Sequence, residues 1–245
     1  MPARQRKILV FEHMPMADAG IFRALLSEHG IGWQAVRFDL GMPIPDLAGF
    51  DALLAMGGDM NVWQEDQYPW LVAEKAAVRE AVERSMPFLG ICLGHQLLAD
   101  ALGGTVAPAA RPEVGVFEIA RTPAGEDHAL LAGLPQRLRV LQWHAAEVTQ
   151  PPAGALVLAS SADCAVQVLA VGKNALGLQC HLEVDPPTLD AWLSLPTNVE
   201  ALVRRRGPHG PCAFADEAHT HMAEFNRSAR ALHANFLARM APGAG

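Results

Sequence analysis

The sequence predicts an α/β fold, in which an open, mostly parallel twisted sheet carries helices on both faces. Two observations support this class. Short apolar runs that are typical of buried strands alternate with helix-spaced segments over roughly the first hundred residues. Two of these strands end in glycine-rich turns, at Gly57-Gly58 and around Cys92. In such sheets the ligand site lies at the carboxyl ends of the strands, so these two turns are expected to face one site.

The first half of the chain gives the alternating pattern element by element. Four apolar runs predict strands, and three segments with apolar residues at helical spacing predict helices. Gly30 is expected to end the first helix, and Pro87 ends the second helix and begins the fourth strand. The expected strands are residues 7–12, 33–38, 51–56 and 88–91, and the expected helices are 19–29, 71–85 and 95–102.

The second half of the chain has a different pattern of predicted secondary structure. Short strand candidates are separated by Pro/Gly turns with few helices between them, which favours an antiparallel extension of the sheet. These candidates are residues 114–121, 137–143, 155–160, 165–171 and 175–179. Helices are then expected at 188–195, 198–206 and 216–240, with a loop at 207–213. We therefore expect one domain over residues 1–195 and a helical C-terminal extension over 196–245, packed on the same domain.

Composition limits the class of protein further. At 245 residues with 51% hydrophobic side chains, the chain can bury a sizeable core without a disulfide or metal staple. Its cysteines show no C-x-x-C pair, which suits a reducing cytoplasm. The net charge of −7 argues against nucleic acid as a ligand, and no apolar run reaches membrane length. We expect neither a signal peptide nor a membrane anchor at the N-terminus.

The stretch around Cys92 carries the first sign of chemistry. A buried strand at 88–91 runs into Gly90-x-Cys92-x-Gly94, and a helix follows. This is the cysteine version of the nucleophile elbow, in which glycines relieve the crowding of a sharp turn. The sulfur would lie at a helix N-terminus, which favours the thiolate, and the N–H of Leu93 would be free to bind an oxyanion.

Longer sequence motifs, in this stretch and elsewhere in the chain, resemble those of a known protein family. Gly-Ile-Cys-Leu-Gly-His-Gln-Leu-Leu-Ala, beginning at Gly90, resembles the nucleophile motif of class I (triad-type) glutamine amidotransferases. Residues 56–60 resemble the family's glycine-rich oxyanion loop, and residues 142–144 resemble its tryptophan–histidine segment beside the glutamine pocket. Residues 179–183 resemble its Gln-x-His-Pro-Glu motif, with Leu182 where proline is usual. The resemblance spans roughly residues 5–190.

The resemblance implies a flavodoxin-like amidotransferase fold and assigns a role to each motif residue. The implied triad is Cys92, His181 and Glu183, acting on a γ-glutamyl amide through a thioester. The implied oxyanion donors are the N–H groups of Gly57, Gly58 and Leu93, and the implied substrate contacts are Gln96, Trp143 and His144. No cofactor or metal is expected.

Three functions remain open from the sequence. The protein could be a glutaminase subunit that passes ammonia to a separate synthetase, because no P-loop motif occurs in the chain. It could instead be a stand-alone γ-glutamyl hydrolase or peptidase with water as the acceptor, or a non-catalytic regulatory relative. Glu113 is a minor candidate for a binding role and Cys180 for a metal site. The arginines at 204–206 are interpreted as a solvated helix end, with binding of an acidic partner as the alternative.

Overall fold

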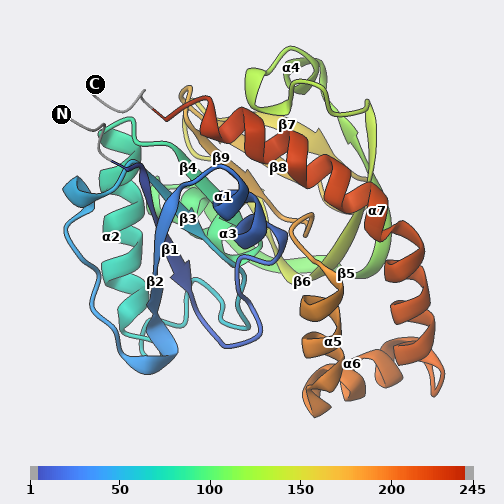
Figure 1. Ribbon diagram of the computed structural model, residues 1–245. Coiled ribbons are helices and arrows are strands. Elements are labelled where there is room, and N and C mark those ends of the chain that lie inside the picture. The colour runs from blue at the N-terminus through green and yellow to red at the C-terminus, as the bar shows by residue number, and fades with distance from the viewer. Residues whose placement is uncertain (1–4, 241–245) are drawn as a thin grey trace.

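A nine-stranded sheet forms the centre of the computed structural model, which describes residues 5–240 (Figure 1). The strand order is β2-β1-β3-β4-β9-β8-β7-β5-β6. The strands are β1 (Lys7–Glu12), β2 (Gly32–Arg37), β3 (Ala52–Ala55), β4 (Phe88–Ile91), β5 (Thr105–Arg121), β6 (Arg137–Gln150), β7 (Leu156–Ser160), β8 (Val168–Val171) and β9 (Ala175–Leu178).

Five adjacent strands, β2, β1, β3, β4 and β9, pair in parallel, and β9, β8, β7, β5 and β6 continue the sheet with antiparallel pairs. The predicted fold class is therefore confirmed. Residues 175–179 were grouped with the antiparallel extension, and β9 does pair antiparallel with β8. It also pairs parallel with β4, Leu89 opposite Leu176, so it joins the two parts of the sheet. This strand brings the segment after it, residues 179–183, to the same sheet edge as the end of β4.

Helices cover both faces of the parallel strands, and the alternation of side chains along β1 shows why. Ile8 and Val10 join a buried cluster with α1 (Ile21–Glu28), whereas Leu9 and Phe11 join a second cluster with α2 (Trp70–Glu83) and α3 (Leu93–Ala101). Successive residues of a strand point to opposite faces, so an all-apolar strand needs cover on both sides. The short helical turns are α4 (Pro123–Glu126) and the 3-10 turns Phe38–Leu40, Leu47–Gly49 and Ala129–Leu131.

Three C-terminal helices follow the sheet: α5 (Pro186–Ser194), α6 (Pro196–Arg206) and α7 (Gly210–Leu237). In Figure 1, α5, α6 and the start of α7 project beyond the sheet, and the rest of α7 crosses the face that α1 also covers. Leu232 and Phe236 of α7 are buried in the cluster that contains β1, and Phe214 packs with Leu141 of β6. The helices therefore share their cores with the sheet.

The loop predicted at 207–213 was wrong beyond its first three residues, because α7 already begins at Gly210. The Gly/Pro content of the segment suggested a loop. However, Pro211 stands in the first turn of α7, where its missing N–H costs nothing, so the proline is compatible with a helix start. No helix in residues 5–240 is both long enough and apolar enough to cross a membrane.

A buried histidine between α1 and α7 predicts acid sensitivity. The ring of His233 stacks on Phe22 at 5.8 Å, and neither ring nitrogen has a hydrogen-bond partner. Burial, together with the nearby His29, lowers the pKa of His233 to about 4. The unfolded chain binds this proton from near pH 6.5 downward, whereas the folded chain binds it only near pH 4. The free energy of unfolding therefore decreases as the pH is lowered from about 6.5 to about 4. We expect His233→Phe to remove about 1.4 kcal/mol per pH unit from the acid-side slope of the unfolding free energy.

Urea unfolding of both proteins at several values between pH 7 and pH 4 measures this slope. The exposed His219 of the same helix offers the control, His219→Gln, which should keep the parent slope. An unchanged slope in His233→Phe would show that His233 does not titrate as the structure indicates.

Candidate active site

Cys92 lies at a sharp turn between β4 and α3. It caps α3 with φ 51° and ψ −100°, a left-handed φ that only two non-glycine residues adopt in the described chain. A Cβ on Gly90 would lie 2.4 Å from the carbonyl oxygen of Gly94, and a Cβ on Gly94 would lie 2.1 Å from that of Ala55. Both glycines are thus needed for backbone approach, which confirms the reason inferred from the sequence.

His181 and Glu183 follow β9 and are held beside the elbow. The His181 N–H donates to the carbonyl of Leu141 at 2.8 Å, and the ring packs edge-on to Trp192 with centroids 4.9 Å apart. Nδ1 of His181 lies 2.7 Å from Oε1 of Glu183, and both side chains are buried. The alternate positions 181 and 183 therefore reach the same side, as the His-x-Glu spacing predicted.

The Cys92 side chain is a neighbour of the His181 imidazole and contributes to the raised pKa of that ring. Burial alone lowers the pKa of His181, but the charge of Glu183, its hydrogen bond to Nδ1 and the neighbouring Cys92 outweigh burial and raise that pKa to about 10. The imidazolium is therefore favoured at neutral pH. A buried cation beside a thiol stabilises the thiolate, so this arrangement can supply a charged sulfur nucleophile and a proton donor.

The Gly57-Gly58 loop lies close to both Cys92 and His181. A Cβ on Gly57 would lie 3.3 Å from Cε1 of His181 and 3.7 Å from Cβ of Cys92. The loop is tied to the elbow by Gly94, whose N–H donates to the carbonyl of Met56 at 3.2 Å. Within the described chain, no acceptor is found for the N–H groups of Gly57, Gly58 and Leu93. These three donors are free to bind an anionic oxygen.

Two residues that the sequence analysis did not single out, His13 and Glu74, fix the position of this loop. Nδ1 of His13 lies 2.8 Å from the carbonyl oxygen of Gly57, and Nε2 lies 2.9 Å from Oε1 of Glu74. Both side chains are fully buried, and the His13 ring stacks on Trp70 at 5.4 Å. Burial disfavours a charged ring, but the charge and hydrogen bond of Glu74 and the Gly57 carbonyl together raise the pKa of His13. The carbonyl and N–H of a trans peptide point in opposite directions, so fixing the Gly57 carbonyl also fixes the Gly58 N–H.

Glu183 is positioned by the turn before α1. The N–H of Ile21 donates to the carbonyl of Glu183 at 2.8 Å, and Gly20 has φ 49°. A Cβ on Gly20 would lie 2.1 Å from that same carbonyl oxygen, so the turn admits only glycine there. Gly20 is a second feature that the sequence analysis missed.

His144 lies in a buried polar network on β6. Its Nδ1 is 3.0 Å from the carbonyl of Ala146 and its Nε2 is 2.8 Å from Oε2 of Glu113. Gln167 donates to the same Glu113 oxygen at 2.6 Å. Since both ring nitrogens already have hydrogen-bond partners, His144 can contact a substrate only through its ring carbons. Trp143 beside it packs edge-on to Trp192 and Phe214, and its carbonyl lies 3.8 Å from the Cys92 sulfur.

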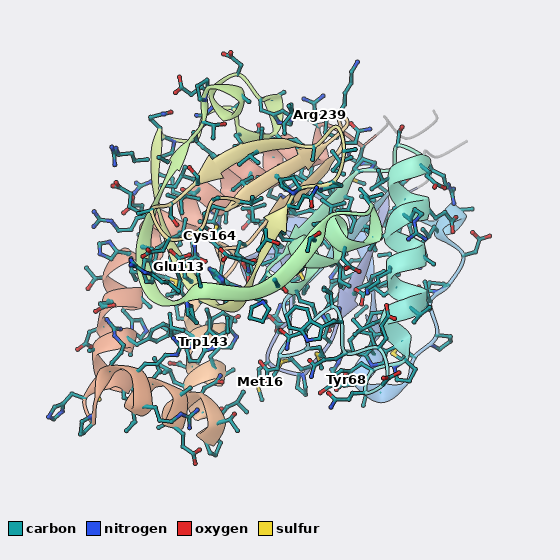
Figure 2. All side chains as sticks on the ribbon, turned by 180° about the vertical axis from the view of Figure 1, so that it is seen from behind. Met16, Tyr68, Glu113, Trp143, Cys164 and Arg239 are labelled. Atoms are coloured by element: carbon teal, nitrogen blue, oxygen red, sulfur yellow. The ribbon has the colours of Figure 1, made fainter. Side chains whose placement is uncertain are left out.

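Glu113, His144 and Cys164 bring three groups of metal-ligand type within 4.8 Å of one another, and Figure 2 labels Glu113 and Cys164 side by side. The chemistry of the group does not favour a cation. Burial raises the pKa of the Cys164 thiol to about 12, and the His144 nitrogens are engaged as described. Cys180, which the sequence raised as a metal candidate, is fully buried, and burial raises its thiol pKa as well.

Two cavities flank the Gly57-Gly58 loop. The smaller, of about 50 Å³, contains His181 and is mostly apolar; Met14, Met16, Ala17, Gly57, Gly58, Asp59, Trp143, Trp192, Leu195 and Asn198 complete its lining. The larger, of about 340 Å³, contains Gln96 and His144; Gly58, Asp59, Met60, Asn61, Val114, Trp143, Ala145, Ala146, Ala201, Arg204 and Arg205 complete it. The side-chain nitrogen of Gln96 donates to the Ala146 carbonyl and to Gln179, both at 3.1 Å, which leaves its carbonyl oxygen for a ligand.

Comparison with known proteins identifies the family of the chain. The family model described as glutamine amidotransferase class-I matches residues 25–193. One subunit of a glutamine-hydrolysing GMP synthase from Saccharolobus solfataricus is 39% identical over 143 residues, which cover 58% of this chain and 72% of the relative. Gamma-glutamyl peptidase 4 of Arabidopsis thaliana is 28% identical over 195 residues, covering 74% and 77%. The crystal structure of a glutamine amidotransferase from Thermotoga maritima superposes with a TM-score of 0.85 at 25% identity, covering 96% of this chain and 99% of that one.

The chain belongs to the class-I glutamine amidotransferase family. It is accordingly a cysteine-dependent amide hydrolase, and the hypothesis of a non-catalytic relative is set aside.

Proposed function

We propose that the protein hydrolyses a γ-glutamyl amide through Cys92, His181 and Glu183, and that the ammonia released from glutamine passes to a separate synthetase. The observation that carries the proposal is the elbow cysteine joined to the His181–Glu183 pair under three free N–H groups. An amide needs a strong nucleophile, a proton donor for its leaving nitrogen and donors for the oxyanion, and these groups supply all three.

This geometry supports the following reaction. The Cys92 thiolate attacks the γ-carbonyl carbon, and the carbonyl oxygen becomes an oxyanion bound by the N–H groups of Gly57, Gly58 and Leu93. His181 then gives its proton to the leaving nitrogen, so that the C–N bond breaks and a γ-glutamyl thioester remains on the sulfur. Glu183 stabilises the imidazolium throughout. Water, deprotonated by the now neutral His181, attacks the thioester and releases glutamate.

The cavity with Gln96 supports the assignment of the substrate side chains. The free carbonyl oxygen of Gln96 can accept from the α-ammonium of glutamine, and Trp143 forms the wall between the two cavities. His144 serves this cavity by holding Ala146 and Glu113 in place.

The synthetase partner is supported by the Saccharolobus solfataricus relative, which is named as one subunit of a glutamine-hydrolysing GMP synthase. A second candidate is a stand-alone γ-glutamyl hydrolase that uses water as the acceptor. It is favoured by the C-terminal helices, since Trp192, Leu195 and Asn198 line the cavity that contains His181 and could enclose a larger leaving group. The similarity to gamma-glutamyl peptidase 4 supports this alternative too.

Glutamate release by the purified protein distinguishes the two. We expect hydrolysis of glutamine that a co-purified partner stimulates. Robust hydrolysis of γ-glutamyl dipeptides by the protein alone, without stimulation on glutamine, would support the stand-alone hydrolase instead. Failure to release glutamate from either substrate, with and without the partner, would refute the proposed function.

The His13–Glu74 pair should affect the chemical step rather than binding. His13→Phe keeps an aromatic ring beside Trp70 but frees the Gly57 carbonyl, so the Gly58 N–H is no longer fixed. An oxyanion donor acts in the transition state, and its loss typically costs 10²–10³-fold in kcat. We expect kcat to fall by about 10- to 100-fold with KM within about two-fold, and Glu74→Gln, which can keep a hydrogen bond to His13, to fall less.

The rate at which iodoacetamide alkylates Cys92 serves as the control, because the nucleophile itself should be unaffected. A rise in KM with unchanged kcat in His13→Phe would contradict the positioning role.

A further inference from the structure

The larger cavity carries charged groups from a part of the chain that the family model does not match. Arg204 and Arg205 of α6 line it, together with Asp59 of the loop that follows Gly58. The family model matches residues 25–193, so both arginines lie outside the matched segment. From the sequence, these arginines were interpreted mainly as a solvated helix end, with binding of an acidic partner as the alternative.

The three consecutive arginines of α6 are not equivalent. Arg206 donates to Oε1 of Glu217 on α7 at 2.6 Å. Arg204 has only Glu200 at 3.7 Å, with both side chains 70% exposed, which is a weak surface pair. Arg205 makes no hydrogen bond or ion pair with the residues that the structure describes. Two guanidinium groups are therefore available to a ligand in the cavity.

The position of the cavity decides which end of a substrate it receives. The γ-carbonyl must lie over Cys92, and its leaving nitrogen must face His181, which lines only the smaller cavity. The other end of the γ-glutamyl unit then extends toward the larger cavity, which shares Gly58 with the smaller one. That end carries an α-carboxylate and an α-ammonium group. Guanidinium binds carboxylate in a fork of two parallel hydrogen bonds, and a carboxylate such as Asp59 pairs with ammonium.

We propose that Arg204 and Arg205 bind the α-carboxylate of the γ-glutamyl substrate, and that Asp59 binds its α-ammonium. This inference rests on the proposed hydrolysis of a γ-glutamyl amide. It gives the C-terminal helices a role, since α6 completes the substrate site. It also defines the substrate class as γ-glutamyl compounds with a free, zwitterionic α-amino-acid end.

Steady-state hydrolysis of two substrates by four proteins tests this. The substrates are L-glutamine and L-glutamine α-amide, in which a neutral carboxamide replaces the α-carboxylate. The proteins are the parent, Arg205→Gln, the double variant Arg204→Gln/Arg205→Gln, and the control Arg206→Gln, whose side chain pairs with Glu217. A charge-assisted hydrogen bond corresponds to roughly a tenfold or larger change in binding.

For glutamine, we expect KM to rise about tenfold in Arg205→Gln and further in the double variant, with kcat within about two-fold. For the α-amide, the parent should already have a high KM, and the arginine substitutions should not raise it. Arg206→Gln should match the parent on both substrates. Equal effects on the two substrates, or an unchanged KM for glutamine in the double variant, would overturn the inference while leaving hydrolysis itself established.

Calorimetric binding of L-glutamine to Cys92→Ala separates this inference from the reaction. We expect binding by Cys92→Ala and at least tenfold weaker binding when both arginines are also replaced by glutamine. Equal binding by the two proteins would refute the role of the arginines even if the parent hydrolyses glutamine. If the parent hydrolyses no γ-glutamyl substrate, the proposed function fails and this inference fails with it.

Discussion

Cys92→Ala is expected to abolish glutamate release while the protein remains folded. The substitution removes the sulfur that neighbours the His181 imidazole and that attacks the substrate in the proposed reaction. Replacing a triad nucleophile typically costs 10⁴-fold or more in kcat, so activity should fall to background. The side chain is only 7% exposed but is small, and alanine can keep the turn at φ 51°, so we expect a loss of about 1 kcal/mol or less in stability.

The matched control is Cys212→Ala, since Cys212 is a free, exposed cysteine of α7. It should retain full activity and parent stability. Measurable turnover by Cys92→Ala, at more than a thousandth of the parent rate, would show that the sulfur of residue 92 is not the nucleophile.

Glu183→Gln should leave partial activity, with kcat lower by about 10²- to 10⁴-fold. In the parent, Oε1 of Glu183 lies 2.7 Å from Nδ1 of His181. The side-chain amide introduced at position 183 can still form a hydrogen bond to Nδ1, but it lacks the negative charge that favours the imidazolium. The nucleophile and the oxyanion donors remain, so the loss should be smaller than in Cys92→Ala.

The pH profile provides the specific test of Glu183. In the parent, the raised pKa of His181, about 10, keeps the ring protonated well above neutral pH. Without the charge of Glu183, this pKa falls and the ring loses its proton at lower pH. We therefore expect the alkaline limb of kcat/KM to move toward neutral pH in Glu183→Gln, and the imidazole resonance of His181 to titrate in parallel. An alkaline limb at the same pH in both proteins would contradict this role.

The elbow could be predicted from the sequence because its cause is local. Gly90 and Gly94 lie within two residues of Cys92, and the crowding that they relieve occurs within one turn of chain. The proximity of Cys92 and His181 depends on the pairing of β4 with β9, whose paired residues are 87 positions apart in the sequence. It was suggested only by the resemblance to a family.

His13 and Glu74 could not be predicted in this way. They are 61 residues apart and belong to a strand end and a helix, and nothing in their spacing indicates contact. The available signal was the position of His13 just after β1, at the carboxyl edge where ligand sites form. The lengths of β5 and β6 were also underestimated, since strands were predicted at 114–121 and 137–143, whereas β5 begins at Thr105 and β6 ends at Gln150. In the structure, a register shift between Pro108 and Glu113 accommodates the proline within the ribbon.

The most direct test of the account is a search for the covalent intermediate. The protein is incubated with a glutamine analogue that carries an electrophile at the γ position, digested, and mapped by mass spectrometry, with and without excess L-glutamine. We expect a single modified peptide with the label on Cys92, and protection of that site by glutamine. Inactivation with the label on another residue, or labelling of Cys92 that leaves glutamate release intact, would contradict the central claim that the Cys92 sulfur attacks the substrate.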